Sequence, residues 1–403
     1  MHILLIHQAF VTTGEAGGTR HMELARFLSE KGNSVTVITS PVSYLTGKAK
    51  RGAETPNEET IEGIRILYAR TARGMHRGFV PRLIAFFSFM FSSLRLALSV
   101  PDVDLVWGTS PNLFQAVSAW AAARLKRKKF LLEIRDLWPD FAIGMGELRN
   151  GVLIFAARVL EKFLYRHADQ IIVNSPGFIP HIQRLSGKTA RLIPNGADVQ
   201  MFTPTNVTAY RDADWRKEDG FVVMYTGAHG PANDLKTALD AAARLKESEP
   251  SVRFVFVGSG KEKTRLVELA EARKLTNVTF LPPVSKSEIA NLIAASDAGL
   301  AILKTIPEFR TTYPNKVFDF MAAGKPVICQ IDGVIREVLD RYQAGVYVEP
   351  GNAEALADAI RGMVRKRDEL EEMGRNGRRA VMGEFSRERA AHDFLALIEK
   401  INA

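Results

Sequence analysis

Short runs of β-branched and other apolar residues alternate with amphipathic helical stretches along this chain, and that alternation limits the fold more than any other feature of the sequence. It is typical of βαβ units, in which parallel strands are joined by helices that cross a face of the sheet. A helix over 20–30, ended by Gly32, separates the first two expected strands. The first series of expected strands covers 3–6, 35–39, 64–68, 103–107, 130–134, 170–174 and 191–194.

A second series begins after a stretch in which the pattern is lost. The segment 197–220 collects a proline, several aspartates and a glycine, so we place an interdomain linker at 199–220. The strands expected after it cover 221–226, 252–257, 278–281, 299–303, 327–329 and 345–348. We therefore predict an α/β fold of two Rossmann-like parallel-sheet domains, 1–198 and 221–386. Ligands of such sheets bind beyond the carboxyl ends of the strands, so a cleft is expected between two facing sheets.

Length and composition agree with two globular cores. The chain has 403 residues, of which 46% are hydrophobic and 25% charged, enough for two domains rather than one. Its single cysteine, Cys329, excludes an internal disulfide and a cysteine-based zinc site, which favours a reduced, cytoplasmic location. The first expected strand follows Met1 and His2 without a basic start, so it is not interpreted as a signal peptide.

The charge of the chain favours an anionic partner. Its formal net charge of +9 leaves nucleic acid, nucleotide phosphate and anionic lipid open. The basic runs at 124–129 and 361–379 are most simply solvated helix faces. A third group of arginines precedes an apolar helix expected over 79–100.

This helix over 79–100 has two interpretations. Its uncharged core, 83–94, is only twelve residues long, whereas a bilayer requires about 20. The helix can be a buried element of the first domain. Alternatively it presents an interfacial face to anionic lipid, since four phenylalanines follow a series of arginines. The residues concerned are Phe86, Phe87, Phe89 and Phe91, preceded by Arg65, Arg70, Arg73, Arg77 and Arg82.

Glycine-containing turns after expected strands are candidates for phosphate binding. Gly17 and Gly18 open the first helix, where backbone can approach a ligand and free N–H groups can bind an anion. The second domain repeats this arrangement after its first strand with Gly227, His229 and Gly230. A further turn carries Lys261, but it lacks the glycine spacing and the hydroxyl residue of an ATPase phosphate loop. Neither glycine turn has the dinucleotide spacing, which disfavours a nicotinamide enzyme.

Charged residues mark two further positions. Arg135 and Asp136 follow a buried strand, which places them at the ligand-binding edge of the first sheet. Lys316 and Asp319 stand three apart on an expected helix that opens at Pro314, so they share one face of that helix, either as a surface ion pair or as ligand contacts. The acidic pair at 102–104 opens a strand instead of ending one, and no metal site is predicted. No Ser-His-Asp grouping has supporting spacing.

Taken together, these segments resemble the retaining glycosyltransferases of family 4, which have the GT-B fold. The resemblance covers nearly the whole chain. It rests on the Gly17-Gly18-Thr19-Arg20 loop, on Leu192-Ile-Pro-Asn-Gly-Ala-Asp198 before the domain crossover, and on Asp319-Phe-Met-Ala-Ala-Gly-Lys-Pro326. The last segment matches the second acid of the family's E-x7-E signature and the helix that follows. The resemblance implies that the second domain binds a nucleotide-sugar, that the first binds the acceptor, and that a helix over about 387–403 returns to the first domain.

The resemblance also implies roles for individual residues. Asp319 would accept hydrogen bonds from the ribose diol, because a carboxylate offers two acceptor oxygens. Lys316 would neutralise the diphosphate, with Lys261 in reserve, and would act in catalysis together with Arg135 and Asp136. The implied nucleotide-sugar site consists of Gly17, Gly18, Gly227, His229, Gly230, Lys261, Val284, Thr312, Tyr313, Asn315, Lys316 and Asp319. No cofactor is implied beyond the sugar nucleotide, and the departing phosphate would itself take the acceptor's proton.

Two departures from the family pattern narrow the resemblance. Thr311 stands where the first acid of the signature is expected, and Arg135 stands where many members have histidine. Three segments instead resemble the branch that builds bacterial O-antigen or capsule, including N-acetylfucosamine transferases: Arg135-Asp-Leu-Trp-Pro139, Gly227-Ala-His-Gly-Pro-Ala-Asn233 and Pro314-Asn-Lys316. That branch implies a UDP-linked N-acetylated sugar as donor, a polyprenyl-diphosphate sugar as acceptor, and peripheral contact with the cytoplasmic face of the inner membrane. A GT-B-type sugar-nucleotide epimerase is the alternative enzyme. A basic nucleic-acid binder would need exposed aromatics along one basic face, whereas the phenylalanines here lie in an apolar run.

Overall fold

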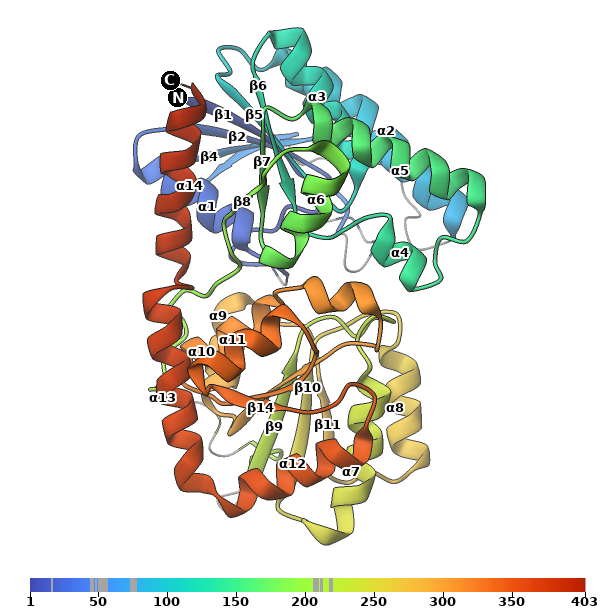
Figure 1. Ribbon diagram of the computed structural model, residues 1–403, viewed down its shortest axis with the longest axis vertical. Helices are drawn as coiled ribbons and strands as arrows, with labels where there is room; N and C mark the ends of the chain where they lie inside the picture. The colour runs from blue at the N-terminus through green and yellow to red at the C-terminus, as the bar shows by residue number, and fades with distance from the viewer. Residues whose placement is uncertain are drawn as a thin grey trace. The chain divides into compact units, whose positions relative to one another are not determined.

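In the computed structural model the chain forms two compact units, each built around its own sheet (Figure 1). Unit 1 comprises Met1–Thr12, Gly18–Pro194 and Ala391–Ala403, and unit 2 comprises Thr13–Gly17 and Asn195–Ala390. The structure describes residues 1–15, 17–43, 47, 49, 57–72, 78–205, 210, 213–216 and 220–402. The expected α/β class with two Rossmann-like, parallel-sheet domains is confirmed.

The sheet of unit 1 has eight strands in the order β3-β4-β2-β1-β5-β6-β7-β8. All pairings are parallel except that of the edge strand β3 with β4. The strand order changes direction beside β1, the type of position where parallel sheets bind ligands. The strands are β1 (His2–Ile6), β2 (Ser34–Thr39), β3 (Glu58–Ile61), β4 (Ile64–Tyr68), β5 (Leu105–Thr109), β6 (Lys129–Ile134), β7 (Gln170–Val173) and β8 (Arg191–Leu192).

Helices cover both faces of this sheet, because alternate side chains of each strand point to opposite sides. Leu4 and Leu132 belong to a core that includes Phe89 of α2 and Ala119 of α3. On the other face Trp107 contacts His21 of α1 and Phe394 of α14, with ring centroids 5.2 and 4.7 Å apart. The helices are α1 (Arg20–Glu30), α2 (Phe79–Ser99), α3 (Leu113–Lys126), α4 (Asp140–Gly144), α5 (Gly151–His167), α6 (Ile179–Ser186) and the end of α14 (Arg387–Asn402).

The sheet of unit 2 has six parallel strands in the order β11-β10-β9-β12-β13-β14. The strands are β9 (Phe221–Thr226), β10 (Val252–Val257), β11 (Val278–Leu281), β12 (Ala298–Ile302), β13 (Val327–Gln330) and β14 (Gly345–Tyr347). The helices are α7 (Leu235–Ser248), α8 (Lys263–Ala272), α9 (Lys286–Ala294), α10 (Asn315–Ala322), α11 (Val334–Tyr342), α12 (Ala353–Arg365) and α13 (Arg367–Gly383). Alternate strand residues again feed two cores, one on each face.

The described residues of the expected linker, 199–220, pack on unit 2. Phe202 and Trp215 lie in its core, together with Val317 of α10. Just before this segment, the Ala197 N–H donates to the Phe385 carbonyl at 3.0 Å. A side chain at Gly196 would collide with that same carbonyl, so only glycine fits there.

The helix expected over 79–100 is α2, and it is buried on one face and exposed on the other. Phe89 is fully buried in the core of unit 1, so its expected contact with a membrane is wrong. Phe91 and Ile84, by contrast, are 65% and 54% exposed. By length and mean hydropathy alone, Val80–Ser99 could cross a bilayer. In the structure 22% of its most apolar stretch is buried inside the protein. The arginines at 73 and 77 lie outside the described residues.

Candidate functional site

A buried carboxylate organises the ligand-binding edge of unit 1. Glu133 lies near the end of β6 on the face covered by α1, and its side chain is fully buried. Its two oxygens are occupied by different residues of α1: Arg20 Nε at 2.9 Å and His21 Nε2 at 2.8 Å. Burial alone would raise the pKa of Glu133, but the hydrogen bond from His21 and the positive charge of Arg20 hold it well below its usual range. Glu133 is therefore ionised at every physiological pH.

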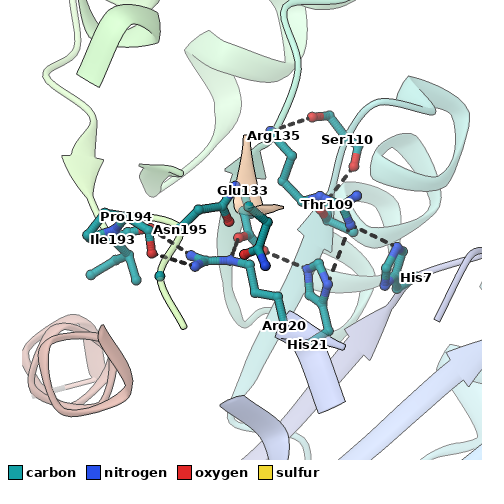
Figure 2. A network of polar contacts seen from close by, with 12 residues as sticks. His7, Arg20, His21, Thr109, Ser110, Glu133, Arg135, Ile193, Pro194 and Asn195 are labelled. Carbon is teal, nitrogen blue, oxygen red and sulfur yellow. Dashed lines mark hydrogen bonds and ion pairs between the residues drawn. The ribbon is translucent and has the colours of Figure 1, made fainter. Parts of the chain in front are cut away.

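Arg20 connects this carboxylate to the end of the unit's sheet. Its two terminal nitrogens donate to the carbonyl oxygens of Pro194 and Ile193 at 2.8 and 2.7 Å (Figure 2). All three nitrogens of one guanidinium are thus hydrogen-bonded in one plane between β6 and the segment after β8. The sequence interpretation placed Arg20 in the glycine loop but did not foresee this contact.

Arg135 extends from the end of β6 toward two imidazoles. Its Nη1 lies 3.2 Å from His7 Nε2 and 3.4 Å from His21 Nδ1, so His21 stands between Arg135 and Glu133 (Figure 2). The backbone N–H of Arg135 donates to Ser110 Oγ at 2.8 Å, which fixes the start of this loop on the end of β5. The prediction that Arg135 lies at the carboxyl edge of the sheet agrees with this position.

Asp136 follows Arg135 and faces a desolvated environment. Burial raises the pKa of its carboxyl to about 6, and the positive charge of Arg135 opposes this rise. The backbone N–H of Asp136 lies 3.4 Å from Ser110 Oγ. A carboxyl group with a pKa near neutrality can either accept or donate a hydrogen bond to a hydroxyl group.

In unit 2, the glycine turns after β9 and β10 are bonded to each other. The Gly227 N–H donates to Val257 at 3.0 Å, and the His229 N–H donates to Ser259 at 2.9 Å. Gly227 and Gly258 have φ angles of +134° and +142°, which disfavour any side chain. A Cβ atom at Gly258 would also collide with the Gly227 carbonyl. The glycines are therefore needed for the two turns to meet.

Lys316 of α10 reaches these turns. Its Nζ lies 3.7 Å from the centroid of the Tyr225 ring and 3.3 Å from the place that a Cβ of Gly227 would take. Its ammonium makes no hydrogen bond or ion pair with the residues that the structure describes. Burial lowers the pKa of Lys316 to about 7, although Asp319 acts in the opposite direction. A cation on an aromatic face, beside glycine backbone and without an acceptor, is suited to bind an anion.

Asp319 pairs with a lysine that the sequence interpretation missed. Its carboxylate is 4% exposed and accepts a hydrogen bond from Lys286 Nζ at 2.7 Å. Asn315 Nδ2 donates to both of its oxygens, at 3.1 and 3.2 Å. The surface-ion-pair interpretation of Lys316 and Asp319 is therefore wrong, because Asp319 is buried and its ion pair is with α9. Lys286 lies 33 residues before Asp319 in the sequence, so its role as the partner of Asp319 is recognised only from the structure.

His229 lies in the turn that follows β9. It is fully buried, and neither ring nitrogen has a hydrogen-bond partner among the described residues. Burial, together with the charges of Lys263 and Lys316, lowers its pKa to about 4. Lys263, which the sequence interpretation did not single out, donates to the Gly258 and Leu281 carbonyls, both at 2.7 Å. It holds the β10 turn beside β11.

The remaining predicted residues of unit 2 lie in loops around this point. Lys261 is exposed, and Val284 lies half-buried in the loop after β11. Tyr313 and Thr312 directly precede α10, and the Tyr313 carbonyl accepts from Asn195 at 2.8 Å. Asn315 also accepts from Arg387 at 3.1 Å. In the glycine loop of the first helix, Gly17 has a φ of +147°, and a Cβ atom at Gly18 would have no atom of the described, non-adjacent residues within 4 Å. A Cβ atom at Gly230 would contact Asn233 Nδ2, at 3.9 Å.

Two family models match the chain, one in each half. Residues 16–196 match the glycosyl transferase 4-like domain, and residues 207–380 match the glycosyl transferases of group 1. Among curated proteins, the chain is 24% identical to the putative colanic acid biosynthesis glycosyl transferase WcaI of Escherichia coli K12, over 84% of this chain and 86% of that one. It is 29% identical to a D-inositol 3-phosphate glycosyltransferase of Mycobacterium leprae, over 87% and 81% of the two chains.

Solved structures share the fold over nearly the whole length. Sucrose-phosphate synthase from Thermosynechococcus elongatus superposes with a TM-score of 0.77 at 20% identity, covering 99% of this chain and 98% of that chain. Anabaena HepE, solved in complex with UDP and glucose, superposes with a TM-score of 0.73 at 19% identity, covering 98% and 99%. At these identities the likeness establishes the GT-B fold.

Proposed function

We propose that this chain, which matches glycosyltransferase families in both of its domains, transfers an N-acetylated sugar from UDP to a polyprenyl-diphosphate-linked saccharide. The proposed reaction belongs to bacterial surface polysaccharide synthesis and retains the configuration at the anomeric carbon. The observation that carries this proposal is Lys316. Its ammonium lies on the Tyr225 ring beside the Gly227 turn with no acceptor among the described residues. That arrangement supports a diphosphate site in unit 2.

In the proposed donor site, a lysine side chain and backbone N–H groups together bind the diphosphate. Lys316 compensates the diphosphate charge, which grows as the sugar departs. The N–H groups around Gly230 and those preceding α10 supply further donors, since backbone amides near glycine can approach phosphate closely. Asp319 accepts from the ribose hydroxyls, and Val284 lies in the loop proposed to hold the base. UDP as the nucleotide draws support from the complex of HepE with UDP and glucose, whose fold this chain shares.

The acceptor side is proposed to lie in unit 1, at Arg135 and Asp136. In the proposed transfer the acceptor hydroxyl oxygen forms the new bond to the anomeric carbon while the bond from that carbon to the diphosphate oxygen breaks. The hydroxyl proton passes to the departing phosphate, so neither a protein nucleophile nor a metal ion is needed. Asp136, with its pKa near 6, orients the acceptor hydroxyl by hydrogen bonding.

A lipid-linked acceptor is supported by an apolar surface on unit 1. Phe91 and Val80 of α2 are 65% and 63% exposed, and Val152 and Phe155 of α5 are 76% and 71% exposed. Both helices pack on α3 (Figure 1). Exposed cations lie beside the apolar residues on each helix, including Arg95, Arg158 and Lys162. Apolar side chains flanked by cations favour binding to anionic membrane. This supports the proposal that the protein binds peripherally to the cytoplasmic face of the inner membrane.

The test combines binding and turnover. A panel of UDP-sugars should raise the melting temperature of the wild type, since a ligand that binds only the folded state stabilises it. Lys316→Met should remove most of this shift. Lys325→Met is a matched control, because burial also lowers the pKa of Lys325, which lies after the C-terminal end of α10. UDP should then be released only when a lipid-linked saccharide is added. Release of UDP without acceptor, or interconversion of the donor sugar, would support the epimerase instead.

A further inference from the structure

The side chain of Arg135 is held by two imidazoles instead of by a carboxylate. The only side chains that accept hydrogen bonds from it among the described residues are the imidazoles of His7 and His21. The nearest buried carboxylate, Glu133, is instead occupied by Arg20 and the far side of His21. Arg135 is therefore fixed in place without being neutralised by an ion pair.

The hydrogen-bond chemistry fixes the tautomer of His21. Ionised Glu133 can only accept, so His21 Nε2 must carry the proton in that contact. Burial lowers the pKa of His21 to about 4, against the opposing effect of Glu133, so the ring is neutral and has no second proton. Its Nδ1 is then a lone-pair acceptor, which is what the Arg135 N–H group requires.

We propose that Glu133 and His21 are positioning residues that hold Arg135 as a fixed, unpaired cation beside Asp136 for the proposed sugar transfer. Glu133 fixes the His21 tautomer, and His21 fixes one nitrogen of Arg135. The other guanidinium N–H groups are thereby left for the anionic part of a substrate, a phosphate or diphosphate. Through Arg20 the same carboxylate also holds the Ile193 and Pro194 carbonyls.

The arrangement explains why a charged residue occupies a core position of β6. The neighbouring inward side chain on this strand, Leu131, and the adjacent Trp107 are fully buried. A carboxylate there is costly unless it is fully paired. Direct pairing of Glu133 with Arg135 would satisfy both charges but would leave no free cation. The interposed neutral imidazole satisfies the carboxylate and leaves the guanidinium without an ion pair.

The first test measures the tautomer and needs no substrate. In protein labelled with 15N-histidine, long-range proton–nitrogen correlation separates protonated from lone-pair ring nitrogens. The wild type should show His21 as the neutral Nε2–H form at pH 7.5, with its signals identified by their loss in His21→Asn. In Glu133→Gln the amide can donate as well as accept, so this tautomer should no longer be fixed. An imidazolium or an Nδ1–H form in the wild type would overturn the proposal.

The second test measures catalysis. Glu133→Gln should lower kcat by about 10- to 100-fold, the loss expected when a reacting group is misplaced, with a smaller change in the KM for the UDP-sugar. His21→Asn should retain more activity than His21→Leu, because its amide oxygen can replace Nδ1 as acceptor. Equal losses in these two variants would count against the proposal.

Glu161→Gln is the matched control. Glu161 is also buried in unit 1, 1% exposed, and its Oε1 accepts from His181 Nε2 at 2.7 Å, away from Arg135. Both variants remove a buried carboxylate from a histidine, so both should lower the melting temperature. Only Glu133→Gln should lower kcat strongly. Equal effects on kcat would reduce Glu133 to a structural role and refute the inference. If no donor and acceptor pair is found, the proposed function fails while the tautomer measurement still decides the role of Glu133 and His21.

Discussion

Binding of UDP to unit 2 should take up a proton at alkaline pH. Free Lys316 has a pKa lowered by burial to about 7, and a bound diphosphate would raise that pKa because it stabilises the charged form. At pH 8 about 0.9 of the free lysine is neutral by this value, so up to about 0.9 proton should bind with each UDP. The contribution of Lys316 to the affinity should be constant well below pH 7 and should fall above it by at most about tenfold per pH unit, or 1.36 kcal/mol.

Calorimetry can measure this directly. Titration of UDP at pH 8 in buffers of different ionisation enthalpy gives the number of protons taken up per ligand. Lys316→Met should abolish the uptake and weaken binding, whereas Lys325→Met should preserve both. Uridine lacks phosphate, so its binding should take up no proton. Uptake that persists in Lys316→Met, or wild-type affinity that does not change between pH 7 and 9, would refute the assignment of Lys316 to the diphosphate.

The same lysine gives a stability signature of defined sign. The pKa of Lys316 in the folded protein lies below the usual lysine value of 10.5, so the unfolded chain binds more protons between about pH 7 and 10.5. Wild-type stability should therefore gain from this group as the pH rises through that window. Lys316→Met should lose the gain, and denaturant titrations at several pH values can measure the difference. An unchanged pH dependence would mean that Lys316 is solvated in the free protein.

Three further predictions follow from single contacts. Gly258→Ala, at a φ of +142°, should lower the melting temperature and eliminate UDP binding together, and retention of UDP affinity would contradict the role given to the paired turns. Lys286→Met should cost about 3–5 kcal/mol in urea unfolding, because the buried carboxylate of Asp319 loses its partner. Adding Asp319→Asn should recover much of that loss, and no recovery would exclude the ion pair as the cause. Phe91→Ser should reduce sedimentation with anionic vesicles at an unchanged melting temperature, whereas Phe89→Ser should destabilise the fold. If Phe91→Ser binds vesicles as well as the wild type does, α2 is not the membrane contact.

The fold was largely predictable because its strands are buried on both faces. Such strands are continuous apolar runs, and 221–226 and 252–257 were placed with their observed ends. The antiparallel edge strand β3, Glu58–Ile61, was missed for the converse reason. Its sequence Glu-Glu-Thr-Ile is short and polar, and its place depends on pairing with β4 instead of on local pattern.

The candidate sites were predicted in part. Lys316, Asp136 and the glycine turns stand where strand ends and helix starts can be located from sequence. The partners of the buried charges were not found, because Lys286 and His21 reach Asp319 and Glu133 from elements distant in the sequence. One signal was available: a glutamate in the apolar run 129–134 must have a buried partner. The sequence indicates that need but does not identify the residue that meets it.

The pairing of Asp319 clarifies why two lysines lie near one carboxylate. Asp319 is buried and accepts hydrogen bonds from Lys286 and Asn315. Because Lys286 compensates Asp319, Lys316 is not required for that task and can remain on the Tyr225 ring. A single lysine serving both would lose its free charge to the carboxylate. Lys286 of α9 therefore pairs with the acid of α10, while Lys316 of α10 keeps its cation on the Tyr225 ring.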